Sequence, residues 1–109
     1  MNKIIHLIND ADCRLFQQSL ELVGKRWSSA ILLAIANGET RFGEIIASVP
    51  GLSDRLLSVR LKELEHAGLI ERKVIASTPV QVRYGLTERG IDLISSLQPL
   101  VDYGHRWED

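Results

Sequence analysis

The chain has 109 residues and a mass of 12.2 kDa, which is the size of one small domain. With 45% apolar and 25% charged residues it has the composition of a soluble globular protein, and we expect it in the cytoplasm. No run of about 18 apolar residues is present, so no membrane span is predicted. The N-terminus lacks the long apolar core of a signal peptide. The single cysteine, Cys13, excludes an internal disulfide and a multi-thiolate zinc site.

Charge is unevenly distributed along the chain, although the formal net charge is only −1. Residues 41–90 carry eight Lys and Arg against six Asp and Glu, whereas residues 91–109 carry one against four. Binding to DNA depends on where cations lie rather than on their total. The charge pattern therefore permits a nucleic-acid-binding surface in the middle of the chain.

Helical spacing of apolar residues predicts two helices in the first third of the chain. The first covers residues 12–23 and ends at Gly24. The second covers residues 25–36, and because apolar residues reach nearly all the way round it, we expect it to be buried in the middle of the domain. Trp27, near its start, is expected to anchor the core.

Two short helices are predicted next. Thr40 is expected to cap the first, and Ser53 is expected to cap the second. The second then ends at Gly68, the residue type that favours a left-handed exit from a helix. Together the two predict a helix–turn–helix over residues 41–67.

The apolar period then changes from 3.6 to 2. Residues 80–86 alternate between apolar and polar and predict a half-buried strand, and residues 70–76 form a looser β-rich run, so the pair predicts a hairpin. Thr87 is expected to cap a final helix that Pro99 kinks or interrupts. The order of elements predicts a winged helix-turn-helix, mainly α with a small β-hairpin.

A recognition helix needs an apolar face to dock on its domain and a polar face for the major groove. Residues 53–67 have both, and the outward side of the hairpin, with Lys73, Gln81 and Arg83, can follow a phosphate backbone. The candidate residues for contact with double-stranded DNA are Arg41, Ser53, Asp54, Arg55, Ser58, Val59, Lys62, Lys73, Ser77, Thr78, Gln81 and Arg83. The alternative is a solvated amphipathic helix beside an edge hairpin whose cations keep it soluble.

Ordered motifs over about residues 13–107 resemble the HxlR family of winged helix-turn-helix regulators, distant relatives of the MarR type. The matching pieces are Cys13, Gly24-Lys25-Arg26-Trp27, Gly38-x-x-Arg41-Phe42, Pro50-Gly51-Leu52-Ser53, Leu57-x-x-x-Leu61-x-Glu63-Leu64, Gly68-Leu69-Ile70-x-Arg72, Thr78-Pro79-Val80-x-Val82-x-Tyr84 and Leu86-Thr87-x-x-Gly90. The resemblance implies a homodimeric transcriptional regulator, usually a repressor, that binds a palindromic operator. It also implies one domain over residues 1–109, with the wing at about 70–86 and dimerisation through about 1–24 and 88–109.

An apolar surplus near both ends of the chain agrees with the implied dimer interface. Its candidate members are Leu15, Phe16, Leu97, Leu100, Val101, Tyr103 and Trp107. The alternative is that these residues complete a monomeric core. Residues 1–12 match no part of the resemblance, and residues 3–8 are a candidate extra interface segment.

Cys13 is the candidate regulatory thiol. Its place relative to the Gly-Lys-Arg-Trp motif resembles that of the sensing cysteine in redox- and quinone-responsive family members. A helix N-terminus and Arg14 favour a thiolate there, whereas Asp10 and Asp12 oppose it. Oxidation would give a bridge between two chains or a mixed disulfide, and a quinone would give an adduct. The alternative is a small apolar residue packed under the first helix.

We expect no enzymatic activity, cofactor or metal site. No phosphate-cradling glycine loop or catalytic-triad spacing occurs, and His6, His66 and His105 are scattered. The competing function is a winged-helix module for protein–protein assembly. Such a module would usually show an apolar patch where this chain has Arg55, Ser58 and Lys62.

Overall fold

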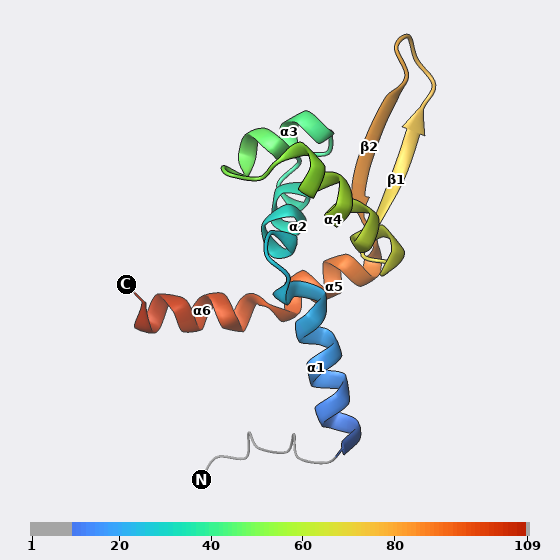
Figure 1. The fold of residues 1–109 in the computed structure, drawn as a ribbon. Helices are drawn as coiled ribbons and strands as arrows, with labels where there is room; N and C mark the ends of the chain where they lie inside the picture. Colours follow the sequence, from blue (N-terminus) through green and yellow to red (C-terminus); the bar gives the residue numbers. More distant parts are fainter. Residues whose placement is uncertain (1–9, 109) are drawn as a thin grey trace.

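The computed structural model describes residues 10–108, so residues 3–8 and His6, singled out above, lie outside the described part. The elements, in chain order, are α1 (Asp10–Gly24), α2 (Ser28–Ala36), α3 (Phe42–Ser48), α4 (Asp54–His66), β1 (Ile70–Ile75), β2 (Gln81–Leu86), α5 (Glu88–Ser96) and α6 (Gln98–Trp107) (Figure 1). The predicted winged helix-turn-helix is confirmed, with α3 and α4 as the helix–turn–helix and β1 and β2 as the wing. None of the described helices is long and apolar enough to cross a membrane.

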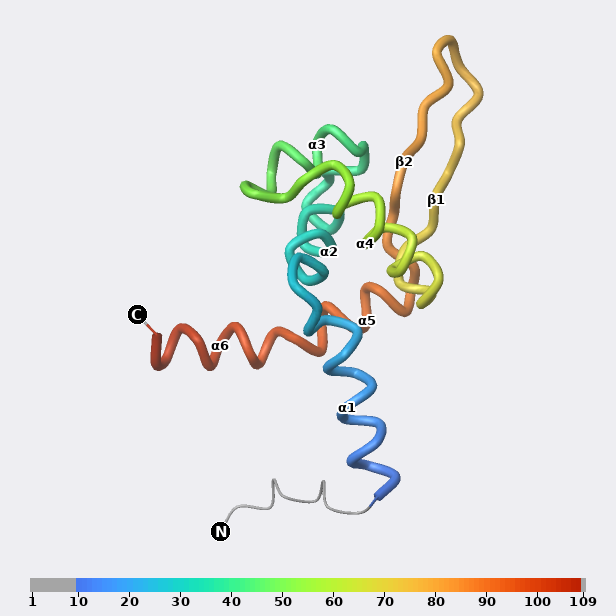
Figure 2. The backbone as a smooth tube through the Cα atoms, viewed as in Figure 1, coloured from blue at the N-terminus to red at the C-terminus, as the bar shows by residue number. Residues whose placement is uncertain are grey.

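The elements form a body with three projections. The tube view shows the wing rising from one end of the body, while α1 and α6 leave the other end in different directions (Figure 2). Neither α1 nor α6 contains a buried residue. Both helices are therefore arms that project from the body, although Leu22 near the end of α1 packs against the core.

Helix α2 lies at the centre of the body, as predicted, and contacts α1, α3, α4, α5 and β2. Its Ile31 and Leu32 are fully buried. The expectation of burial all round is wrong at Leu33, which is 51% exposed, because no described element covers that side.

Helix α2 also begins three residues later than predicted. Trp27 has a φ of 82° and is the residue before the helix, so the backbone turns there before the helix starts. The indole is half buried and packs on the core. The guanidinium of Arg26 lies over the indole ring, 4.7 Å from the ring centroid, in a cation–π contact. Trp27 is thus part of the core, as predicted.

The predicted cap of α3 needs correction. The helix begins at Phe42 after Arg41, rather than after Thr40. The carboxylate of Glu44 accepts the backbone N–H groups of both Thr40 and Arg41, at 3.0 Å each. The Thr40 carbonyl accepts the N–H of Tyr84 in β2 at 2.8 Å. Thr40 therefore joins α3 to the wing, a long-range contact that local spacing does not reveal.

The ends of α4 follow the prediction. The Ser53 hydroxyl accepts the N–H of Leu56 at 3.1 Å and caps the helix. At the other end Gly68 has a φ of 79°, and the Leu69 N–H reaches back to the Leu64 carbonyl at 3.0 Å. Leucines 57, 61 and 64 are buried, so the opposite face of α4 is turned outward.

The hairpin pairs β1 and β2 antiparallel, from Ile70 opposite Leu86 to Ile75 opposite Gln81. Two details differ from the prediction. Strand β2 begins at Gln81, and Val80 is outside it and 61% exposed. Every residue of β2 is half buried, without the expected alternation, because the start of α3 covers its polar side chains.

The final helix is interrupted near Pro99, as predicted. Leu97 separates α5 from α6, and Pro99 lies in the first turn of α6. At the start of α5 the Thr87 hydroxyl accepts the Gly90 N–H at 3.1 Å and donates to the Gly68 carbonyl at 2.6 Å. Arg89 donates to the Ala67 carbonyl at 2.7 Å. These bonds attach the start of α5 to the C-terminal end of α4.

Candidate nucleic-acid interface

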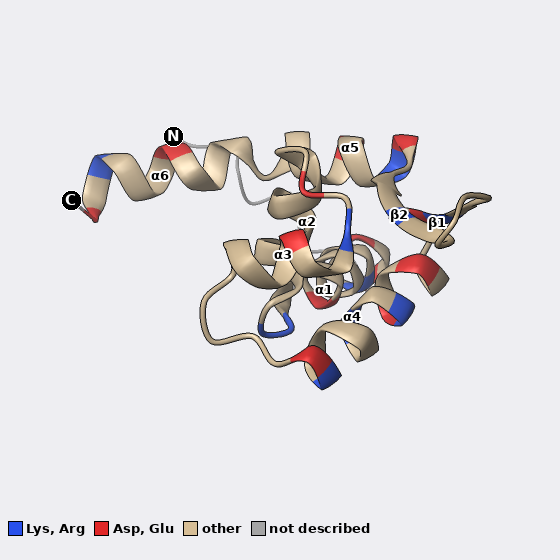
Figure 3. Cartoon of the chain, turned by 90° about the horizontal axis from the view of Figure 1, so that it is seen from above, with Lys and Arg blue, Asp and Glu red and all other residues tan. Residues whose placement is uncertain are grey.

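The outward face of α4 gathers the predicted DNA-contacting residues of the helix–turn–helix. Ser53, Asp54 and Arg55 are exposed at its first turn, where the helix dipole favours an anion. Ser58, Val59 and Lys62 are exposed further along. Both basic and acidic residues occur along α4 when the chain is seen from above (Figure 3). This face is polar rather than apolar, which is the feature that separates a groove-binding helix from an assembly patch.

Three predicted residues meet where the start of α3 approaches β2. Arg41, before α3, donates to the Gln81 Oε1 at 3.3 Å, and Arg83 donates to the same oxygen at 3.4 Å. Arg83 also donates to the Thr40 hydroxyl at 3.3 Å. The outward orientation predicted for Gln81 and Arg83 needs correction, because both are half buried against the start of α3. We call Arg41, Gln81 and Arg83 the α3–β2 cluster.

Glu44 balances part of the charge of the α3–β2 cluster. The hydrogen bond from the Arg41 N–H, followed by that from the Thr40 N–H, holds the pKa of Glu44 below its ordinary value, and the charges of Arg41 and Arg83 add to this effect. Glu44 is therefore ionised at neutral pH. Two guanidinium groups and one carboxylate leave the cluster with a positive charge.

The remaining predicted wing residues are exposed. Lys73 lies 3.7 Å from the carboxylate of Glu71 on the same side of β1. Ser77, in the turn, donates to the Pro79 carbonyl at 2.6 Å, and Thr78 follows it. The structure thus groups the predicted residues as the α4 face, the α3–β2 cluster and the exposed residues of the wing, all in the upper part of the molecule in Figure 1.

One cation between these groups, Arg72, was not among the predicted contact residues. Arg72 of β1 lines a cleft between α4 and the wing, with Lys62 on the α4 side. The period of two along a strand could have indicated this position. Arg72 is two residues after the core residue Ile70 and so lies on the same face of β1.

The candidate dimer residues are exposed on the two arms. Leu15 and Phe16 of α1 and Leu100, Val101, Tyr103 and Trp107 of α6 are all exposed, with Trp107 at 73%, whereas Leu97 is half buried. They do not complete the core of the described chain, so the monomeric-core alternative is not supported. Leu20 of α1, Leu33 of α2 and Ile91 of α5 are also exposed apolar residues, which the prediction did not name.

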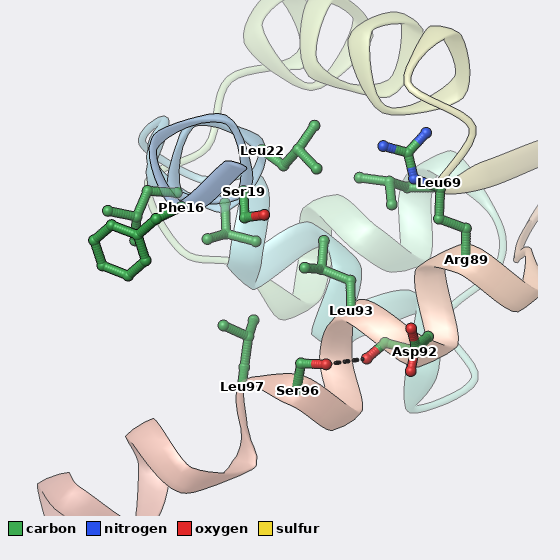
Figure 4. A pocket seen from close by; sticks show the side chains of 11 residues that line it. Phe16, Ser19, Leu22, Leu69, Arg89, Asp92, Leu93, Ser96 and Leu97 are labelled. Atoms are coloured by element: carbon green, nitrogen blue, oxygen red, sulfur yellow. Dashed lines mark hydrogen bonds between the residues drawn. The ribbon is translucent and has the colours of Figure 1, made fainter. Parts of the chain in front are cut away.

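Two hollows meet at Leu97 between these arms. One, of about 410 Å³, lies between α1 and α5, with Leu22 and Leu93 on its walls, Phe16 at one end and Arg89 and Asp92 toward the other (Figure 4). The other, of about 240 Å³, lies between α2 and α6 and is lined by Leu33, Leu100 and Val101. Apolar surface therefore runs from α1 to α6 through the break between α5 and α6.

Cys13 lies near the start of α1 and is exposed. The helix also places Asp10 and Asp12 in its first turn. Exposure does not fit the alternative in which the thiol packs beneath the first helix. Among residues 10–108 no three His, Cys, Asp or Glu side chains gather as candidate metal ligands.

A capped, outward-facing polar helix beside a cationic hairpin defines a winged helix-turn-helix DNA-binding protein. A model of the HxlR-like helix-turn-helix family matches residues 22–109, and the chain belongs to this family. It is a DNA-binding transcriptional regulator, as its curated relatives are.

Individual relatives match nearly the whole chain. YvaP, an HTH-type transcriptional regulator of Bacillus subtilis strain 168, is 41% identical over 97 residues, which are 89% of this chain and 90% of YvaP. YodB of the same strain is 38% identical over 97 residues, 89% of this chain and 83% of YodB. The reduced form of YodB superposes with a TM-score of 0.80 at 37% identity, covering 87% of this chain and 93% of that structure. A MarR-family regulator from Enterococcus faecalis V583 gives a TM-score of 0.83 at 25% identity, covering 99% and 94%.

Proposed function

We propose that the chain is a cytoplasmic homodimeric repressor that binds a palindromic operator. In this proposal the first turns of α4 enter the major groove, where Arg55 and Ser58 bond base edges and Val59 packs on a thymine methyl group. Ser53, Asp54 and Lys62 complete this face. The α3–β2 cluster, Lys73, Ser77 and Thr78 follow the phosphate backbone. The observation that carries the proposal is the exposed polar face of α4 beside a cationic wing.

The two arms support the dimer. Helices α1 and α6 expose apolar side chains that the body leaves uncovered, and a second copy would cover them. A two-fold axis between the arms would place the two α4 helices about 34 Å apart, which is one turn of DNA. The operator would then consist of two inverted half-sites at that spacing.

We further propose that Cys13 is the regulatory thiol. YodB has been solved in reduced, diamide-treated and quinone-bound forms, and HypR in reduced and oxidised forms. Diamide would take two electrons and two protons from two Cys13 thiols and join their sulfurs as a disulfide, and a quinone would be attacked by the thiolate to form a C–S bond. Either product on α1 would change the dimer and hence the separation of the α4 helices.

Titration of the reduced protein into labelled DNA from upstream of its own gene tests the proposal. We expect selective binding that diamide or a quinone abolishes in wild type but not in Cys13→Ser. Equal release of both proteins would overturn the thiol proposal and leave the repressor intact. A failure to select any DNA from a random library would overturn the repressor and favour the assembly module.

A further inference from the structure

We infer that the cleft between α4 and the wing holds one phosphate of the DNA backbone between Lys62 and Arg72. This inference rests on the proposed DNA binding and deepens it. It assigns a role to Arg72, which lies outside the contact residues proposed above.

The orientation of Arg72 follows from the register of the hairpin. Ile70 of β1 is 2% exposed and belongs to the core, so its face of the strand looks toward the body. Arg72 is two residues further along and therefore points the same way. Its partner across the hairpin is Tyr84, which packs against the core cluster. Lys73 points to the opposite side of the strand, where Glu71 also lies.

The cleft that Arg72 enters has a volume of about 450 Å³. Helix α4 contributes Ser58, Lys62 and Glu65 to its walls, and the wing contributes Arg72 and Tyr84. Phe42 and Leu61 also line it. Two cations and one carboxylate give the cleft a net positive charge, and the hydroxyl groups of Ser58 and Tyr84 are additional hydrogen-bond donors.

The two cations are available for a ligand. Within residues 10–108 neither Lys62 nor Arg72 forms an ion pair or a side-chain hydrogen bond, although other nearby cations do. Arg60 is bound to Glu63 and to the Arg26 carbonyl, and Arg83 is bound to Thr40 and Gln81.

A backbone phosphate fits this arrangement better than an apolar or a cationic ligand. A guanidinium and an ammonium from opposite walls can share the oxygens of one phosphate. The cleft opens between the two elements that we place in the groove and along the backbone, so a strand that leaves the groove beside α4 crosses it. Glu65 repels a second phosphate and so favours one position of the strand.

The test compares the salt dependence of DNA binding in charge-neutralised variants. Arg72→Gln, Lys62→Gln and the double variant are titrated by fluorescence anisotropy into the upstream duplex and a random-sequence duplex over a series of salt concentrations. Arg106→Gln, at the exposed end of α6 away from the wing, removes the same charge and is the matched control. Arg72→Lys keeps the charge, and urea denaturation of each variant checks that it is folded.

One shared phosphate makes a specific prediction. In a plot of the logarithm of the DNA affinity against the logarithm of the salt concentration, each phosphate contact makes the slope more negative by about 0.9. One contact therefore lowers the affinity about 3.5-fold when the salt concentration rises fourfold. We expect the double variant to lose about one such contact, equally on both duplexes. Arg72→Lys and Arg106→Gln should keep the wild-type slope. Replacing the contacted phosphate by an uncharged methylphosphonate should weaken DNA binding by the wild-type protein. The same replacement should not change DNA binding by the double variant.

Three results would overturn the inference. The double variant could lose about two contacts, which would mean separate phosphates. A folded Arg72→Gln protein could show the same salt dependence of DNA binding as Arg106→Gln. Arg72 would then contact no phosphate, although the proposed DNA binding by the protein would stand. Wild type could bind neither duplex in a salt-dependent way, and the proposed function would then fail together with the inference.

Discussion

Gly90 is the position at which a single methyl group should be most damaging. It lies in the first turn of α5 with no positive φ, so Ala would normally stabilise the helix there by up to about 1 kcal/mol. A Cβ at Gly90, however, would overlap the carbonyl oxygen of Leu69 and lie 3.1 Å from its carbonyl carbon. That oxygen also accepts the Thr87 N–H at 3.1 Å, so moving it away breaks a hydrogen bond.

The expected cost of Gly90→Ala follows from these contacts. Overpacking against backbone costs about 1–3 kcal/mol, and the lost hydrogen bond costs about 1 kcal/mol. After the gain in helix propensity, we expect a net loss of about 2 kcal/mol in the free energy of unfolding. For a domain of this size the loss corresponds to a fall of about 8–16 °C in Tm.

Urea and thermal unfolding at one fixed protein concentration measure this loss, because association would make Tm depend on concentration. Gly43→Ala is the matched control, since Gly43 lies in α3 with open space around its Cβ position. It should be as stable as wild type or slightly more stable. A Gly90→Ala protein with an unchanged or higher Tm would refute the proposed close contact between α5 and Leu69.

Three further predictions concern the helix–turn–helix. Ser53→Ala removes the cap of α4 and should lower the free energy of unfolding by about 1 kcal/mol in urea titrations; an unchanged midpoint would show that the cap contributes nothing. The depressed pKa of Glu44 stabilises the folded state at neutral pH, and this contribution should be lost as pH falls below about 4.3. Glu44→Gln should flatten the acid limb of a Tm–pH profile, and a profile like that of wild type would contradict the role given to Glu44. Arg55→Ala should weaken binding to the operator by about 1–3 kcal/mol if Arg55 reads a base, whereas equal weakening on random DNA would assign it to a phosphate.

The boundaries of the elements were largely predictable from the sequence. Ser53, Gly68 and Thr87 act through hydrogen bonds or backbone angles within a few residues, so their types and spacing already indicate where helices begin and end. Pro99, in the first turn of α6, marks the nearby break between α5 and α6 for the same local reason. The outward face of α4 was equally readable, because three leucines at helical spacing define the opposite, buried face.

Contacts between distant segments were not predictable in this way. Alternation in the second strand suggested that Arg83 points outward, but the side chain is covered by Thr40, 43 residues earlier in the chain. Thr40 is not the cap because the helix begins one residue later than expected, after Arg41, and the Thr40 hydroxyl accepts a hydrogen bond from Arg83. Arg72 and Lys62 line one cleft only because β1 lies beside α4 in the folded chain.

Features that depend on residues close together in the sequence could therefore be predicted, whereas features that depend on distant segments could not. Amino-acid type and spacing by themselves specify caps, turns and the apolar side of each element, since these depend on neighbours within one or two helical turns. The side of the wing that faces α4, the residues covered by the start of α3 and the need for glycine at position 90 depend on how the packed elements approach one another. Those approaches come from the burial of α2 in the centre of the body, around which α1, α3, α4, α5 and β2 are arranged.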